Sequence, residues 1–210
     1  MGKFRKHKIE RSCDKTYQNY RDYKQYLQKD FEHRCAYCNL HDESITTYFE
    51  IDHYIPQKSF KNKRKELETL YPNLMYSCKK CNLSKSNHFL GDVYSDPLKN
   101  DLVYNPVESD YNSIFYRDEY GGIDVYSEND RFLVSLLKLY LPIHNLAWVS
   151  EELTMLILQI KGHLLNQHLP KDVLEQLNNS LGPLCIVSES WKRNFIARYN
   201  NNTLTSLEDI

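Results

Sequence analysis

Long hydrophobic runs are missing from this 210-residue chain. The longest strongly apolar stretch, residues 153–160, is interrupted by polar side chains and is far shorter than the roughly 18 residues that a membrane helix needs. The basic N-terminus has no apolar segment, so it does not resemble a secretory signal. The phosphate loops GxxxxGKS/T and GxGxxG do not occur either. We therefore expect a cytoplasmic protein with no membrane partner and no nucleotide-binding motif of its own.

A large net charge is also missing, since the formal charge is only -1 at pH 7. The distribution is nevertheless uneven. Residues 1–92 carry 18 Lys or Arg against 12 Asp or Glu, a net of +6, whereas residues 93–210 carry 9 against 16, a net of -7. The first part is therefore biased toward polyanions such as nucleic acid, and the second part is not.

Six cysteines are present, and four of them form two C-x-x-C pairs that are separated by 39 residues: Cys35, Cys38, Cys78 and Cys81. In a reducing cytosol such pairs are more often metal sites than disulfides. Two pairs can supply four thiolates in a tetrahedron, which suits a structural Zn²⁺ ion. The long spacer indicates that a further unit is inserted between the pairs.

The hydrophobic patterns predict an α+β chain that is mainly helical. Helices are expected over residues 17–32, from about Cys81, over 130–141, over 145–166, over 171–179 and over 187–199. Strands are expected over residues 46–55 and 73–77 and as a hairpin on either side of Gly121 and Gly122. These elements indicate three parts: a basic, flexible N-terminal arm (1–16), a domain that holds the cysteine pairs (17–92), and a hairpin with a helical C-terminal region (93–210).

The segment around the cysteine pairs carries an ordered set of short motifs. Asp52-His53-x-Ile55-Pro56 precedes Asn73-Leu74, and the second cysteine pair continues directly into Asn82-x-x-Lys85. In this order, residues 31–92 resemble the HNH endonuclease family. The resemblance implies a ββα-metal unit in which one divalent ion, Mg²⁺ or Mn²⁺, lies between strand and helix. Asn82 stands where the family usually has His, which is a familiar variant.

The residue types suit phosphodiester hydrolysis. His53 is the candidate general base, because a neutral imidazole can accept a proton near pH 7. The carboxylate of Asp52 and the amide oxygen of Asn82 are ligands that a hard cation prefers. Neighbouring strand residues point to opposite faces, so we expect a distortion at the strand end that brings Asp52 and His53 to one site. The resemblance implies that Asn73 hydrogen-bonds the loop that carries His53.

Basic residues near these motifs are candidates for nucleic-acid binding. Lys85 lies one helical turn beyond Asn82, and we expect it to contact a phosphate group. Phosphate contacts are also expected from a basic cluster after Pro56: Lys58, Lys61, Lys63 and Arg64. A plain solvated loop is the alternative for that cluster.

Residues 93–210 show no catalytic motif. The sequence L-V-Y-N-P at 102–106, followed by the hairpin and a helix, resembles one HNH subgroup, the Septu-type and retron-associated nuclease subunits of bacterial anti-phage systems. That resemblance implies a DNA endonuclease (with RNA as the other possible substrate) that acts with an ABC- or SMC-like ATPase partner. Two alternatives stay open: a catalytically silent zinc module that only binds nucleic acid or protein, and a stand-alone toxin-like nuclease.

Overall fold

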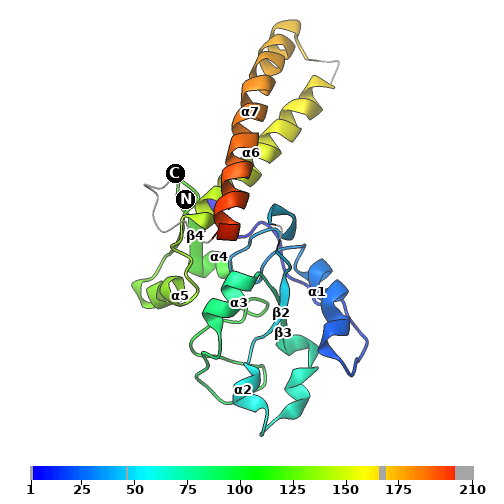
Figure 1. Cartoon of the computed structure of the whole chain (residues 1–210), viewed down its shortest axis with the longest axis vertical. Coiled ribbons are helices and arrows are strands. Elements are labelled where there is room, and N and C mark those ends of the chain that lie inside the picture. Colours follow the sequence, from blue (N-terminus) through cyan, green and yellow to red (C-terminus); the bar gives the residue numbers. More distant parts are fainter. Residues whose placement is uncertain (1, 46, 166–168, 202–210) are drawn as a thin grey trace. The chain divides into compact units, whose positions relative to one another are not determined.

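A computed structural model of the chain describes residues 2–45, 47–165 and 169–201 (Figure 1). The chain divides into two compact units, Met1–Tyr140 and Leu141–Ile210. The hairpin that we expected to group with the C-terminal helices belongs to the first unit. The fold class is α+β and mainly helical, as predicted.

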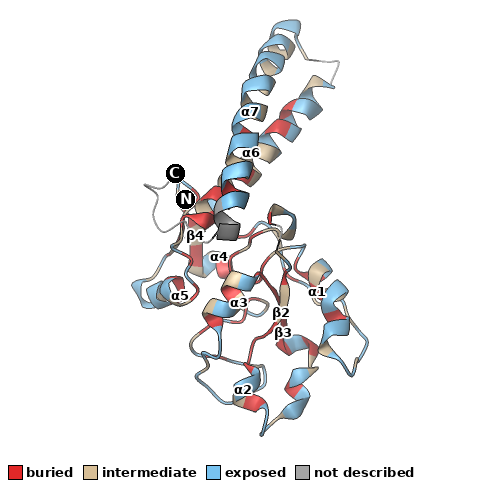
Figure 2. Cartoon of the chain, viewed as in Figure 1, coloured by how far each residue is buried: buried red, intermediate tan, exposed pale blue. Residues whose placement is uncertain are grey.

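The centre of the first unit is a strand pair followed by a helix. β2 (Glu50–His53) runs antiparallel to β3 (Leu74–Ser77), and α3 (Lys79–Lys85) follows directly. The register pairs Glu50 with Ser77 and His53 with Leu74. All four residues of β3 are buried, and Figure 2 shows buried residues concentrated along this pair. This ββα arrangement is the one that the resemblance implied.

The helix expected over 17–32 is shorter. A 3-10 turn (Tyr20–Tyr23), capped by the Asn19 side chain, leads into α1 (Lys24–Asp30). The helix ends because Glu32 and His33 adopt left-handed backbone conformations, which turn the chain toward the first cysteine pair. Tyr23 and Leu27 lie on the buried face and fix α1 against the core.

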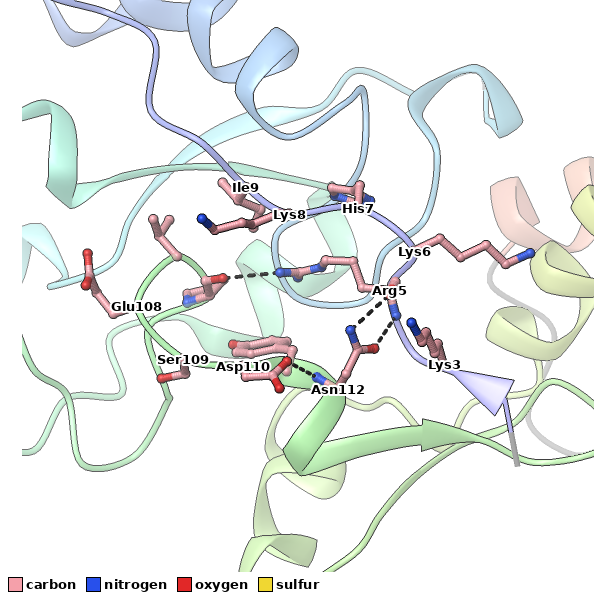
Figure 3. A pocket seen from close by; sticks show the side chains of 13 residues that line it. Lys3, Arg5, Lys6, His7, Lys8, Ile9, Glu108, Ser109, Asp110 and Asn112 are labelled. Atoms are coloured by element: carbon pink, nitrogen blue, oxygen red, sulfur yellow. Dashed lines mark hydrogen bonds between the residues drawn. The ribbon is translucent and has the colours of Figure 1, made fainter.

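The N-terminal segment is folded onto the first unit and is not a flexible arm. β1 (Gly2–Lys3) pairs with β4 (Phe115–Arg117), which pairs with β5 (Ile123–Val125). Arg5 is buried, and its guanidinium donates to the carbonyl oxygens of Pro106 and Ala36 (3.2 and 2.5 Å). Figure 3 shows the paired hydrogen bonds between the Arg5 backbone and the Asn112 side chain. A buried guanidinium needs these acceptors, so its position is strongly specified.

Short helices connect these elements. They are α2 (Gln57–Phe60), α4 (Tyr111–Ile114), α5 (Arg131–Leu136) and the 3-10 helices Asp42–Ser44, Lys65–Glu68, Tyr71–Asn73 and Glu128–Asp130. The helix predicted over 130–141 stops early. Lys138 takes a left-handed conformation, and the Leu139 amide donates to the Val134 carbonyl (2.8 Å), which is the geometry of a helix C-terminus.

The second unit is a helical hairpin. α6 (Ile143–Leu164) packs along α7 (Lys171–Asn201). The two helices predicted over 171–179 and 187–199 are one helix that continues through Pro183, because packing along α6 compensates for the backbone hydrogen bond that proline removes. The end of the helix predicted over 145–166 lies outside the described residues. Within the described ranges, no helix has both the length and the apolar character that crossing a bilayer requires.

Candidate active site and zinc centre

The four paired cysteines converge in the interior of the first unit. Cys35, Cys38, Cys78 and Cys81 are all buried, and their sulfur atoms lie within 4.8 Å of one another. The Sγ atoms of Cys38 and Cys78 are 3.8 Å apart. A tetrahedron of thiolates with Zn–S bonds of about 2.3 Å has edges of about 3.8 Å. The cluster is therefore consistent with a zinc site in which protein side chains occupy every position.

A cavity of about 330 Å³ opens at the end of β2 beside α3. Its lining residues are Tyr20, Ile51, Asp52, His53, Pro56, Gln57, Asn82, Leu83, Ser86 and Asn87. Three predicted site residues, Asp52, His53 and Asn82, thus share one cavity. Asp52 and His53 are the last two residues of β2, and both line this cavity.

The imidazole of His53 is held in one tautomer. Its Nε2 lies 2.9 Å from the carbonyl oxygen of Glu68. A carbonyl oxygen can only accept, so Nε2 carries the hydrogen and Nδ1 keeps its lone pair. The rings of Tyr20 and Phe60 lie beside it, with centroids at 4.9 and 5.8 Å. Burial lowers the pKa of His53, which favours the neutral form that a general base requires.

The carboxylate of Asp52 is held by two buried donors. The Tyr37 hydroxyl donates to Oδ2 at 2.5 Å, and Lys85 Nζ lies 3.1 Å from Oδ1 and 3.0 Å from Oδ2. Lys85 also donates to the His53 carbonyl oxygen at 2.8 Å. Burial, with the negative charge of Asp52, raises the pKa of Tyr37 well above its usual value, so the phenol remains a donor.

Lys85 therefore does not occupy the surface position expected of a phosphate contact. Its side chain is 0% exposed, and its ammonium group faces Asp52 instead of solvent. The sequence contains a signal for this placement. Lys85 follows the buried Cys81 by four residues, so both lie on the same face of α3. Tyr37 lies between Cys35 and Cys38 in the sequence and is buried with them.

Asn73 joins the two segments that flank His53. Its Oδ1 accepts from the Ile55 amide at 2.8 Å, and its Nδ2 donates to the carbonyl oxygens of Leu67 and Ile55 at 2.9 and 3.3 Å. Leu67 precedes Glu68, whose carbonyl oxygen contacts the imidazole. Asn73 is fully buried and lies outside the cavity, in the bracing position that the resemblance implied.

Glu50 is a site residue that the sequence reasoning missed. The Asn82 amide nitrogen donates to Glu50 Oε2 at 2.7 Å, which leaves the Asn82 amide oxygen without a donor among the described residues. Glu50 precedes Asp52 by two residues in β2, so the alternation of strand side chains places both on one face. That spacing was the available signal.

The basic cluster divides into two kinds of side chain. Lys58, Lys61 and Lys63 are exposed on α2 and the turn that follows it. Arg64 is half-buried; it donates to the Val93 carbonyl oxygen at 2.9 Å and pairs with Glu66 at 3.1 Å. The three lysines therefore remain available to an anion, and Arg64 is engaged within the fold.

Comparison with known proteins agrees with this geometry. Residues 35–88 match the HNH endonuclease family. The chain contains an HNH endonuclease domain. It is also 32% identical over 73 residues to the Septu protein PtuB of Bacillus thuringiensis, a match that covers 35% of this chain and 26% of that relative. The chain thus aligns with about a quarter of the relative's length. No solved structure matches this chain.

Proposed function

We propose that the HNH domain is a metal-dependent endonuclease that hydrolyses phosphodiester bonds of DNA. The observation that carries the proposal is the cavity shared by Asp52, His53 and Asn82, together with the contact between Nε2 and Glu68 that leaves Nδ1 of His53 unprotonated. A silent zinc module would need only the cysteine cluster. The hypothesis of a silent zinc module does not explain why a buried, oriented imidazole lies beside a carboxylate and an amide.

In this proposal His53 is the general base. Its Nδ1 accepts a proton from the attacking water, while the Glu68 carbonyl oxygen keeps the ring in place through Nε2. The imidazolium that forms is stabilised by Asp52 nearby. Asn73 acts as a positioning residue, because it ties Ile55 to the segment that ends in Glu68.

The oxygen atoms at the cavity fit a hard divalent cation. Asp52 offers a carboxylate, and Asn82 offers an amide oxygen without a donor among the described residues; Glu50, which accepts a hydrogen bond from Asn82, adds a second carboxylate. Mg²⁺ or Mn²⁺ held there would supply charge stabilisation for the leaving oxygen. Lys85, which is fully buried, balances the charge of Asp52, and Asp52 also lines the cavity.

Two observations support nucleic acid as the substrate. Residues 1–92 are basic overall, and three exposed lysines follow the cavity residue Pro56 in the sequence: Lys58, Lys61 and Lys63. RNA is the alternative substrate. Because the site hydrolyses a backbone ester, the choice between the two rests on contacts beyond the reacting atoms.

We further propose that the protein works with an ATPase partner in anti-phage defence. The similarity to a Septu protein supports this role. The second unit offers a surface for a partner protein, because its helices expose several large apolar side chains: Met155, Leu158, Ile186 and Val187. The stand-alone toxin-like nuclease is the alternative, in which the helical region would serve self-association.

The experiment that tests the proposed chemistry is a cleavage assay on plasmid DNA and on RNA with Mg²⁺, Mn²⁺ or EDTA. His53→Ala is expected to lower the cleavage rate by about two to four orders of magnitude, because it removes the proton acceptor. Nucleic-acid affinity in EDTA should stay unchanged. A His53→Ala protein that cleaves at the wild-type rate would remove His53 from the mechanism.

The partner proposal is tested by co-purification of the full chain with the ATPase encoded next to its gene. Ile186→Asp combined with Leu158→Asp should abolish co-purification, because each carboxylate disrupts an exposed apolar position of the hairpin. Lys58→Asp is the matched control on the basic unit and should leave co-purification intact. Full co-purification of the hairpin variant would contradict the proposed surface.

A further inference from the structure

A second cavity, of about 590 Å³, adjoins the proposed catalytic cavity. Tyr20, Ile51 and Asn82 line both cavities. The other residues of the second cavity come from the 3-10 turn and the first residue of α1, and from the segment that leads into the first residue of β2: Arg21, Lys24, Tyr48, Phe49 and Glu50. A ligand that extends past Asn82 from the catalytic cavity therefore enters the second one.

Two pairs of a cation and an aromatic ring line this second cavity. The guanidinium carbon of Arg21 lies 5.7 Å from the ring centroid of Tyr20, and Lys24 Nζ lies 5.9 Å from the ring centroid of Tyr48. Both cations are exposed. Neither forms an ion pair with any side chain in the described parts of the chain, so both charges are available to an anion.

Tyr48 differs from the aromatic residues of the core. Tyr23, Tyr37 and Tyr54 are almost completely buried, whereas Tyr48 is 86% exposed. A single exposed ring needs no explanation by itself. Here the exposed ring is part of a cavity wall, carries an unneutralised ammonium group beside it, and adjoins a site proposed to cut nucleic acid. Together these features describe a surface suited to flat, anionic ligands.

Rings interleaved with cations match the alternation of bases and phosphates along a nucleic-acid strand. Bases stack on tyrosine rings, and phosphates are attracted to Lys and Arg. In a fully paired duplex both faces of each base are covered by its neighbours. Within a duplex, away from its ends, an exposed protein ring can therefore stack only on a base that has left the helix or was never paired.

We propose that Tyr48, with Lys24 and Arg21, forms a stacking platform for an unpaired nucleotide next to the scissile phosphate. The proposal rests on the proposed nuclease function, because it uses the position of the catalytic cavity to place the bound strand. It defines the substrate class as nucleic acid with a single-stranded segment at the cleavage position, such as an overhang, a flap or a loop. A continuous duplex would leave the platform empty.

The test measures binding of the full chain in EDTA, so that it does not depend on catalysis. The probes are a fluorescently labelled 20-nucleotide single strand and the matching blunt duplex, each prepared as DNA and as RNA. Tyr48→Leu is expected to weaken single-strand binding by roughly 5- to 150-fold, the effect of losing one stacked base. Duplex binding should change less than about twofold. Tyr48→Phe keeps the ring and should bind as the wild type does.

The control for surface effects is Tyr120→Leu, because Tyr120 is an exposed tyrosine (68%) outside both cavities. It should bind like the wild type. A single strand with 2-aminopurine at successive positions adds a direct readout of stacking. Its fluorescence should be quenched at one position by the wild type and by Tyr48→Phe, and this quenching should be lost in Tyr48→Leu.

Two results would overturn the platform: equal single-strand affinity of Tyr48→Leu and the wild type, or equal losses for Tyr48→Leu and Tyr120→Leu. The second would mean that the loss is a general surface effect. If His53→Ala cleaves normally while Tyr48→Leu loses the quenching, the catalytic assignment fails and the platform stands. If His53→Ala is inactive while Tyr48→Leu keeps full affinity, the platform fails and the nuclease stands.

Discussion

Replacing Lys85 with Met tests the most unexpected feature of the site, a fully buried ammonium group. Methionine is close to lysine in length and lacks the charge, so it removes the partner of Asp52 without leaving a large cavity. The Asp52 carboxylate then keeps only the Tyr37 hydroxyl as a buried donor, and the His53 carbonyl oxygen loses its contact with Nζ. These buried oxygen atoms have no water to replace the lost donor, so the substitution leaves them with fewer hydrogen bonds.

The expected loss of stability follows from this burial. Removing one member of a buried ion pair costs about 3–5 kcal/mol, because the remaining charge is left uncompensated. Lys85→Met combined with Asp52→Asn should recover a substantial part of that loss. The double variant contains neither charge, and the new amide can still hydrogen-bond the Tyr37 hydroxyl.

The assay must report on the first unit alone. Both tryptophans, Trp148 and Trp191, lie in the helical hairpin, so tryptophan fluorescence follows the second unit. Release of zinc to a coloured chelator during urea unfolding follows the first unit, since α3 carries both Lys85 and Cys81. Lys85→Met should release zinc at a clearly lower urea concentration than the wild type, and the double variant should lie between them.

The surface-contact interpretation of Lys85 makes the opposite prediction. If Lys85 bound phosphate, its substitution would leave the urea midpoint unchanged and weaken DNA binding. It would also reduce the slope of log K against log salt concentration by about one. Unchanged zinc release by Lys85→Met, together with a shallower salt slope, would refute the buried pair. A double variant less stable than either single variant would refute the proposed coupling between Lys85 and Asp52.

The remaining predictions concern the zinc cluster and the brace. Cys35→Ser should lose zinc and unfold the first unit, because in such sites metal binding supplies much of the folding free energy; elemental analysis and near-UV circular dichroism of the tyrosines would check this. Tightly bound zinc at one ion per chain in this variant would contradict the cluster. Asn73→Ala should cost about 2–4 kcal/mol in urea unfolding, since it removes three buried hydrogen bonds, and it should slow cleavage by releasing the segment beside His53. Loss of stability with an unchanged cleavage rate would leave Asn73 a structural role only.

Much of the site was accessible from the sequence because its signals are local. The spacing of the cysteine pairs, the adjacent Asp52 and His53, and the turn at Asn73 specify residue types at fixed separations along the chain. Such signals survive without knowledge of the fold, because a C-x-x-C pair or a strand–turn–strand is formed mostly by its own residues. The structure has the ββα arrangement that the resemblance implied, and Asp52, His53 and Asn82 line one cavity beside it.

The tertiary structure decided the features that depend on distant partners. Lys85 became a buried counter-ion because α3 turns the face of Cys81 toward the core, and the N-terminal basic segment became an edge strand because Arg5 finds acceptors at residues 36 and 106. The pairing of Tyr20 and Tyr48 with cations beside the catalytic cavity joins segments 28 residues apart. Local sequence patterns indicate which side chains could take part in a site. Tertiary packing decides which of these side chains are buried and need a partner within the protein, and which stay exposed and can bind a ligand.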